Sequence, residues 1–371
     1  MSEAIRRALV AVVSGETLSR AEAESVMGAV LDGEVTPAQL GALLMGLRMR
    51  GETIEELTGF ASAMRARVIR VHAPEGVIDT CGTGGDLRAT FNISTASALV
   101  VAAAGVPVAK HGNRAVTSAS GSSDVIGALG LSVETSAEEA EASIAEVGFG
   151  FLHAPGFHPG MRHAGPTRRE LGVRTAFNLC GPIANPAMPA RQLVGVADPA
   201  SAERVAHALR ALGVERAFVV HGDRIDELPL DGSGVIYDVR PDGVTRLRVD
   251  PVAVGIERAD SAALAGGTPD ESAAIIRAVF DGSRTGPAAD VVALNAGAAL
   301  VVAGRAESLA EGVALARETI ASRRTAALLE RLRAREEARV EAAQAADAAQ
   351  SAGAAAAGSG ANTGSSSAAV A

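Results

Sequence analysis

The sequence predicts an α/β protein with a small N-terminal all-helical domain and a larger α/β domain that contains a mostly parallel central sheet. Three stretches of different pattern along the 371 residues lead to this fold class. Residues 1–72 show helical patterns only, whereas residues 73–340 alternate short β-branched runs with Ala-rich helical stretches. Residues 341–371 are rich in Ala, Gly and Ser and offer almost nothing to bury, which predicts a disordered tail.

The helical domain is expected because N-cap residues recur in it, each with a reciprocal acceptor three positions later. Leucines follow at helical spacing between Leu40 and Leu47, and Gly33 and Gly51 stand where helices would stop. The cap pairs are Ser19 with Glu22, Thr36 with Gln39, and Thr53 with Glu56.

In the larger domain, the alternation of patterns is typical of parallel strands joined by helices. Apolar, β-branched runs predict strands at 77–78, 106–108, 149–152, 193–196, 217–220 and 235–237. Helices are predicted at 94–104, 137–147, 200–212, 271–281, 288–303 and 306–340. The alanines from residue 341 onward favour helix, but helix propensity alone does not keep a helix stable in water. We therefore expect a frayed helix end before the disordered tail.

The composition excludes several kinds of partner and location. The chain has 34 basic and 43 acidic side chains, a net charge of −9 and 2% aromatic residues, so neither nucleic acid nor a membrane is an expected partner. Cys81 and Cys180 form no CxxC pair, which predicts no disulfide framework or zinc site and a cytoplasmic location. The N-terminus lacks a signal-peptide pattern, and the apolar run 96–108 is too short to span a bilayer.

A glycine-rich stretch, residues 79–86, follows the first predicted strand. Its glycines let backbone N–H groups converge on an anion, although the stretch is neither a Walker A loop nor a complete dinucleotide-binding motif, and an ordinary turn is the alternative. Residues 91–95 then open an apolar helix that Ser94 or Thr95 would cap, so its N-terminus is either an ordinary cap or an anion site. Two phosphate-compatible features so close together favour the functional interpretation.

Lys110 is the only lysine in the chain, against 33 arginines. It ends a predicted strand in the run 110–114, which also carries Asn113 and Arg114, and several hydroxyl residues follow. The compact ammonium of lysine, the guanidinium of arginine and nearby hydroxyl groups together suit a substrate with more than one phosphate. A solvated charge cluster is the alternative.

Three histidines at a spacing of five residues, His153, His158 and His163, invite comparison with a metal site. They lack the i, i+4 spacing of ligands on a helix, and the Pro and Gly residues between them predict a loop. We therefore expect a pocket wall, with Arg168 able to grip a substrate carboxylate.

Adjacent carboxylates at Asp226 and Glu227 follow another predicted strand. Such a pair on a loop converges readily on a hard cation, and Mg²⁺ commonly takes one or two carboxylates and completes its shell with water and phosphate oxygens. An acidic surface pair is the alternative.

Taken together and in this order, these stretches resemble the anthranilate phosphoribosyltransferases, a tryptophan-biosynthesis family among the nucleoside-phosphorylase-like transferases. The resemblance covers about residues 5–335 and implies a homodimer formed through the helical domain and a requirement for Mg²⁺, with two ions. It implies magnesium ligands at Ser94, Asp226 and Glu227, and anthranilate contacts at Gly82, Asn113 and Arg168. The residues it implies for phosphoribosyl diphosphate are Gly82, Gly85, Asp86, Thr90, Asn92, Ile93, Ser94, Thr95, Lys110, His111, Gly112, Asn113, Arg114, Ala115, Val116, Thr117, Ser118 and Ser122.

The implied reaction transfers the phosphoribosyl group of 5-phosphoribosyl 1-diphosphate to the amine of anthranilate and releases diphosphate. Catalysis would then rest on holding two substrates in line and on stabilising charge on the leaving group. No residue is required as a general base; His111 is the candidate, and the carboxylate of the substrate is the alternative. A pyrimidine nucleoside phosphorylase would need no Asp–Glu pair, and a non-catalytic nucleic-acid-binding paralogue should be basic, so the sequence favours the transferase over both.

Overall fold

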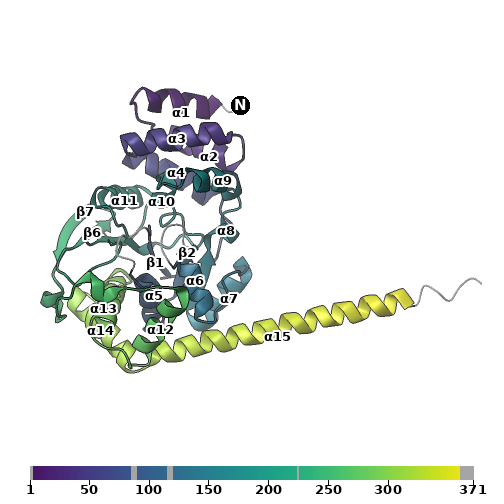
Figure 1. The fold of residues 1–371 in the computed structure, drawn as a ribbon, viewed down its shortest axis with the longest axis vertical. Helices are drawn as coiled ribbons and strands as arrows, with labels where there is room; N and C mark the ends of the chain where they lie inside the picture. The colour runs from purple at the N-terminus through teal and green to yellow at the C-terminus, as the bar shows by residue number, and fades with distance from the viewer. Residues whose placement is uncertain (1–2, 85–89, 115–119, 224, 360–371) are drawn as a thin grey trace, which may run out of the picture.

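The computed structural model describes residues 3–84, 90–114, 120–223 and 225–359, and it confirms the predicted fold class (Figure 1). The N-terminal part is a helical bundle in which the predicted capping boxes at Ser19, Thr36 and Thr53 are all present. Its helices are α1 (Glu3–Val13), α2 (Arg20–Leu31), α3 (Pro37–Arg50) and α4 (Ile54–Ala66).

The larger part is built around a sheet with the strand order β3-β2-β1-β4-β5-β6-β7 in the described part of the chain. Neighbouring strands run parallel from β3 across to β5, and the β5–β6 and β6–β7 pairs are antiparallel. The strands are β1 (Ile78–Gly82), β2 (Val108–Gly112), β3 (Phe149–His153), β4 (Arg191–Gly195), β5 (Arg216–His221), β6 (Gly234–Arg240) and β7 (Gly243–Val249).

Strand β7 was not predicted from the sequence, because an exposed strand needs few apolar residues and so has no apolar pattern to recognise. Its central residues, from Arg246 to Arg248, are exposed at the edge of the sheet. Charged side chains on an edge strand discourage pairing with another chain, but they also remove the alternation by which a strand is recognised.

Successive side chains along each strand point to opposite faces of the sheet, and each face has its own apolar core. Leu193 and Phe218 belong to the core that contains α5 and α13, whereas Val194 and Val219 belong to the core on the opposite face. This second core also includes leucines of the helical bundle, such as Leu40, so the bundle packs directly on the larger part of the molecule. Figure 1 shows the bundle stacked at one end of the sheet.

Short helices at 122–128 and 176–180 occur where none was predicted. The other helices that surround the sheet follow the predicted positions closely, with two differences. The histidine-containing stretch forms the short helices α8 and α9 where a loop was expected, and the predicted helix 306–340 is broken by Arg323, whose φ is +58°. The elements are α5 (Ile93–Ala103), α6 (Ser122–Ala128), α7 (Ala137–Val147), α8 (Ala154–Phe157), α9 (Met161–Leu171), α10 (Ala176–Cys180), α11 (Pro199–Ala211), η1 (Pro251–Val254), η2 (Ser261–Leu264), α12 (Pro269–Phe280), α13 (Pro287–Val302), α14 (Leu309–Ala321) and α15 (Arg324–Ser359).

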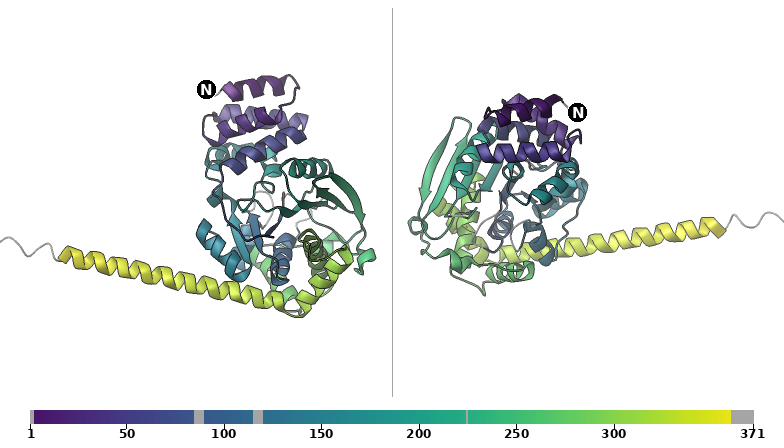
Figure 2. Two further views of the ribbon diagram at one scale, coloured as in Figure 1. Left: turned by 180° about the vertical axis from the view of Figure 1, so that it is seen from behind. Right: turned by 45° about the horizontal axis from the view of Figure 1, so that its top comes forward.

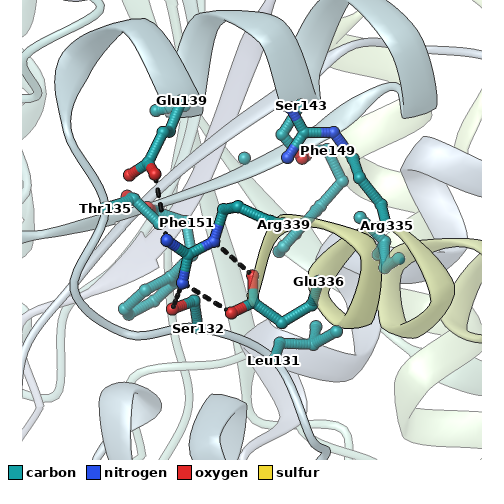
Figure 3. A pocket seen from close by; sticks show the side chains of 13 residues that line it. Leu131, Ser132, Thr135, Glu139, Ser143, Phe149, Phe151, Arg335, Glu336 and Arg339 are labelled. Atoms are coloured by element: carbon teal, nitrogen blue, oxygen red, sulfur yellow. Dashed lines mark hydrogen bonds and ion pairs between the residues drawn. The ribbon is translucent and has the colours of Figure 1, made fainter. Parts of the chain in front are cut away.

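Helix α15 leaves the body of the molecule and projects as a long rod (Figures 1 and 2). The helix continues past residue 341 to Ser359, where a fraying end was expected, because its alanines sustain a helix that is already nucleated on the body. The Arg339 guanidinium anchors it by donating to Glu336 on the same helix, to Glu139 on α7 and to Ser132 (Figure 3). The cavity beside this network has a volume of about 40 Å³, too small for a nucleotide-like ligand.

In the part of the chain that the structure describes, no helix has the length and apolar composition needed to cross a bilayer. Cys81 and Cys180 are both buried and unpaired.

Candidate active site

Most of the described site residues lie at or just after the carboxyl ends of β1 and β2, and β4 is the other neighbour of β1 in the sheet. The chain crosses from β1 to β2 on one side, and β4 lies on the other, so the strand order reverses between β1 and β4. In open α/β sheets, ligands bind at such a switch point, outside the carboxyl ends of the strands. The fold therefore presents the glycine-rich stretch where a ligand site is expected.

The loop after β1 is packed against Asp226, which lies far away in the sequence. The carboxylate Oδ2 of Asp226 accepts a hydrogen bond from the Gly84 N–H at 2.8 Å. A Cβ atom added at Gly82 would lie 2.2 Å from this same oxygen, and one at Gly195 would lie 1.6 Å from the Asp226 main-chain oxygen. Both glycines are therefore required by close approach of the acidic loop, in addition to any role in binding an anion.

Helix α5 begins one residue earlier than its predicted caps. Asn92 is the N-cap residue, so the prediction that Ser94 or Thr95 caps the helix is wrong. The Asn92 amide instead exchanges hydrogen bonds with Ser120, since its Nδ2 donates to the Ser120 carbonyl and its Oδ1 accepts from the Ser120 hydroxyl. This leaves the N-terminus of α5 without a side-chain cap, and the Ile93 and Thr95 N–H groups donate to the main-chain carbonyls of Phe91 and Asn92.

The remaining residues of this segment support the helix from both sides. Ile93 is buried as the first helical residue, and Thr95 is fully buried. Thr90 forms an isolated bridge with Ala265, which ties the segment to the loop before α12.

Lys110 is almost completely buried, with 1% of its surface exposed, and is held between β1 and the start of α5. Its Nζ donates to the Thr80 carbonyl at 2.6 Å and lies 3.4 Å from the Ser94 hydroxyl, so it joins β1, β2 and α5. Burial lowers the pKa of Lys110, and the attraction of the buried Asp79 carboxylate opposes that change. Asp79 also accepts a hydrogen bond from the His111 N–H at 3.2 Å.

His111 is a poor general base in this environment. Its Nδ1 lies 3.1 Å from the Gly181 carbonyl, and its ring stands 5.2 Å from that of His158. Burial lowers the pKa of His111 to about 3 and that of His158 to about 4, so both imidazoles are neutral near pH 7 and take up protons weakly.

These two histidines make stability depend on pH. Their folded-state pKa values lie below the ordinary value of about 6.5, so the unfolded chain binds more protons at intermediate pH. We expect the free energy of unfolding to be fully retained above pH 6.5 and to fall as pH decreases toward 4, by at most about 1.4 kcal/mol per pH unit for each histidine. Urea unfolding of the wild type and His158→Gln between pH 7.5 and 4.5 measures this; equal slopes for both proteins would contradict it.

The loop after β2 is closed by Ser122 at the start of α6. The Asn113 N–H donates to the Ser122 hydroxyl at 3.1 Å, and that hydroxyl donates to the Asn113 carbonyl at 3.2 Å. A Cβ at Gly112 would lie 2.3 Å from the Ser122 Oγ, so this position also requires glycine. Arg114 is exposed and stands 3.8 Å from the Asp124 carboxylate.

Arg168 lies on the last turn of α9, with its guanidinium over the Phe177 ring at 4.9 Å from the centroid. This stacking holds the half-buried guanidinium by its face, so that the N–H groups along its edge can donate to a planar anion such as a carboxylate. The Ser123 hydroxyl lies 2.9 Å from His153 Nδ1, His158 stands against His111, and His163 is exposed beside Gly33, so the three histidines do not meet at one point. Among the described residues no group of three or more His, Cys, Asp or Glu could hold a metal.

The chemistry of Asp226 and Glu227 suits a magnesium ion that is completed by other ligands. They supply two adjacent carboxylates on the loop between β5 and β6, Glu227 being buried and Asp226 half-buried. Oxygen donors in this small number match the preference of Mg²⁺ for a few carboxylates plus water and phosphate oxygens. Of the other predicted site residues, Gly85, Asp86, Ala115, Val116, Thr117 and Ser118 lie outside the described residues.

Sequence reasoning missed two residues that the structure brings into the site. Arg174 donates to the Gly84 and Thr83 carbonyls, and Asp79 lies beneath Lys110. Arg174 stands six residues after Arg168 in a basic run, which is a weak signal. Asp79 is the first residue of the glycine-rich stretch and lies within the buried strand β1, where a carboxylate is an unusual residue type.

The comparisons with known proteins cover both parts of the chain. Residues 6–68 match the glycosyl transferase family, helical bundle domain, and residues 74–326 match the glycosyl transferase family, a/b domain. Curated proteins named anthranilate phosphoribosyltransferase include that of Thermomicrobium roseum, which is 51% identical over 87% of this chain and 94% of its own length. The protein of Desulforudis audaxviator with the same name is 51% identical over 88% of this chain and 95% of its length.

Solved structures agree with these relatives. Anthranilate phosphoribosyltransferase from Thermus thermophilus superposes with a TM-score of 0.84 at 46% identity and covers 90% of this chain and 99% of that one. The enzyme from Saccharomyces cerevisiae, solved in complex with PRPP and Mg, has a TM-score of 0.81 at 26% identity, over 89% of this chain and 97% of that one.

Proposed function

This chain belongs to the anthranilate phosphoribosyltransferase family, and we propose that the residues assembled at the carboxyl ends of β1 and β2 are its active site. The enzyme transfers the phosphoribosyl group of phosphoribosyl diphosphate to the amine of anthranilate, giving N-(5-phosphoribosyl)anthranilate and diphosphate. We place this reaction in tryptophan biosynthesis. The observation that carries the site assignment is the meeting of the glycine-rich loop, the uncapped N-terminus of α5, Lys110 and Asp226 at one switch point.

Phosphoribosyl diphosphate would lie across the loop after β1, the N-terminus of α5 and the loop after β2. Helix-end amides and glycine-loop amides favour anions, and Lys110 adds a buried positive charge beneath Ser94. We propose two Mg²⁺ ions, one at Asp226 and Glu227 and one near Ser94. When bound, Mg²⁺ would share the negative charge of the diphosphate and make it a better leaving group.

Anthranilate would be oriented by Arg168 and Asn113. The Arg168 guanidinium, stacked on Phe177, is suited to a carboxylate, and Asn113 stands on the loop after β2. Because His111 is neutral and a weak base, we assign it no proton transfer; its hydrogen bonds hold the strand end in place. The chain then contributes mainly alignment of the amine with the anomeric carbon and stabilisation of the departing charge.

Loss of anthranilate fluorescence after addition of phosphoribosyl diphosphate and Mg²⁺ tests the function directly. We expect the loss to require all three components. A wild-type protein that consumes no anthranilate under these conditions would overturn the assignment.

Arg168→Ala is expected to raise the KM for anthranilate by about tenfold or more and to change the KM for phosphoribosyl diphosphate much less. The physical reason is the loss of a charge-assisted hydrogen bond to the carboxylate, since the phosphates are bound by other elements. Steady-state kinetics with each substrate varied in turn measures the two constants. Equal increases in both constants would contradict the role of Arg168.

We also propose a homodimer formed through the helical bundle. Three large apolar side chains of α1 and α3 are exposed in the chain by itself, with Val10 at 65% and Val13 and Met49 at 84% each. Such exposure is typical of a surface that is covered by a partner.

The unpaired cysteines support a cytoplasmic location.

A further inference from the structure

We propose that Arg174 is a positioning residue, which clamps the loop after β1 so that the Gly84 amide can be exchanged between Asp226 and a phosphate oxygen. This inference rests on the proposed function for the identity of the anion, but the clamp itself is a property of the protein without substrates. Arg174 lies between α9 and α10, in a part of the chain that contributes no strand to the sheet.

Arg174 holds the loop by its main-chain carbonyls. Its Nη1 donates to the Gly84 carbonyl, and its Nη2 donates to the Thr83 carbonyl at 3.3 Å. The two acceptors belong to successive residues, so the planar guanidinium fork fixes both the position and the direction of this segment.

The opposite side of the same segment is held by main-chain amides. The Thr83 N–H donates to the Gly195 carbonyl at 2.9 Å, and the Gly84 N–H donates to the Asp226 carboxylate at 2.8 Å. Gly84 has a φ of +63°, so the chain turns sharply here as it leaves β1. The position of this turn is therefore determined by Arg174 at its two carbonyls, and by β4 and Asp226 at its two amides.

Arg174 is a half-buried cation that feels the charge of the acidic loop. Burial lowers the pKa of the half-buried Arg174, and Asp226 opposes that change through its charge. An arginine that is partly removed from water and donates to neutral carbonyls gains less than one paired directly with a carboxylate. A cation held in this way, next to the loop that would bind a diphosphate, adds positive potential at the site.

The arrangement has a consequence for substrate binding. A divalent cation bound to Asp226 would draw electron density from the carboxylate and so weaken the hydrogen bond that Oδ2 accepts from the Gly84 N–H. When Asp226 turns to a divalent cation, the Gly84 N–H becomes available to a phosphate oxygen, and the Arg174 bonds keep Gly84 in place during the exchange. The loop after β1 would then bind diphosphate well only in the presence of the cation.

The test compares Arg174→Gln and Arg174→Lys with the wild type, and uses Arg284→Gln as the matched control. Arg284 is exposed on the segment after α12, far along the chain from the site, so its replacement makes the same charge change without touching the loop. Hydrogen exchange is measured on the peptide that contains Thr83 and Gly84, in protein without substrates or metal. Kinetics are then measured with each substrate and with Mg²⁺ varied.

We expect exchange of this peptide to be about tenfold faster in Arg174→Gln, intermediate in Arg174→Lys, and unchanged in Arg284→Gln, since a lysine can hold one carbonyl but not both. The KM for phosphoribosyl diphosphate should rise about tenfold in Arg174→Gln, with the KM for anthranilate little changed and more Mg²⁺ needed for half-maximal rate.

Unchanged exchange in Arg174→Gln, or full activity and exchange protection in Arg174→Lys, would overturn the clamp. Equal increases in the KM of both substrates would also overturn it, because that result points to a general structural role. If the wild type consumes no anthranilate but exchange still accelerates in Arg174→Gln, then the proposed function fails and the clamp stands.

Discussion

Replacing Asp226 and Glu227 together by Ala is expected to abolish turnover, or to leave a residual rate at least about 100-fold lower that needs far more Mg²⁺. The pair supplies the adjacent carboxylates of the acidic loop, and Asp226 also holds the Gly84 amide at 2.8 Å. The double variant removes both the charge that would attract the cation and the anchor of the loop after β1. The rate at saturating substrates, measured over a wide range of Mg²⁺ concentrations, gives the result.

Asp226→Asn separates these two effects. Asparagine keeps an oxygen that can accept the Gly84 N–H but removes the negative charge, so the loop should stay in place while the Mg²⁺ requirement increases. Glu227→Gln provides the same change one residue later, on the buried member of the pair. A Mg²⁺ dependence that stays unchanged in Asp226→Asn, Glu227→Gln and the double variant would refute the metal assignment.

Lys110→Arg is expected to lose at least about 100-fold in activity and about 1–3 kcal/mol in the free energy of unfolding. Lys110 is almost fully buried, and its Nζ meets the Thr80 carbonyl and the Ser94 hydroxyl in a space shaped for one ammonium group. The wider guanidinium needs more acceptors than these and would displace the start of α5. Kinetics and urea unfolding of the purified variant measure the two quantities.

Lys110→Met is the matched comparison, because methionine has a similar length but no charge. It should lose activity as severely while fitting the space better than arginine, so the two variants should differ more in stability than in rate. Full activity in Lys110→Arg would show that the single lysine of this chain is there by chance.

Local structure could be read from the sequence where local interactions decide it. The capping boxes at Ser19, Thr36 and Thr53 involve residues three apart, and all of them are present in the structure. The apolar strands from β1 to β6 were also predicted, because strands buried on both faces have a strong composition signal. The edge strand β7 was not predicted, since its exposed, Arg-containing centre carries no such signal.

Errors arose where a tertiary contact outweighs a local preference. Ser94 and Thr95 are good N-cap residues by type, yet Asn92 occupies the cap because Ser120, 28 residues away, engages its side chain. The last helix is likewise anchored by a distant residue, since Arg339 donates to Glu139 across 200 residues of sequence. Neither partner is detectable from the neighbouring sequence.

By itself, the sequence determined which elements form and which residue types stand at the strand ends, because caps, periodicity and glycine positions act over a few residues. Only the tertiary structure decided how those residues meet. Gly84 bonds to Asp226 across 142 residues and to Arg174 across 90, and the single lysine is buried beneath Ser94. Such contacts depend on the order of strands in the sheet, and that order is set by the packing of distant segments, which no local pattern encodes.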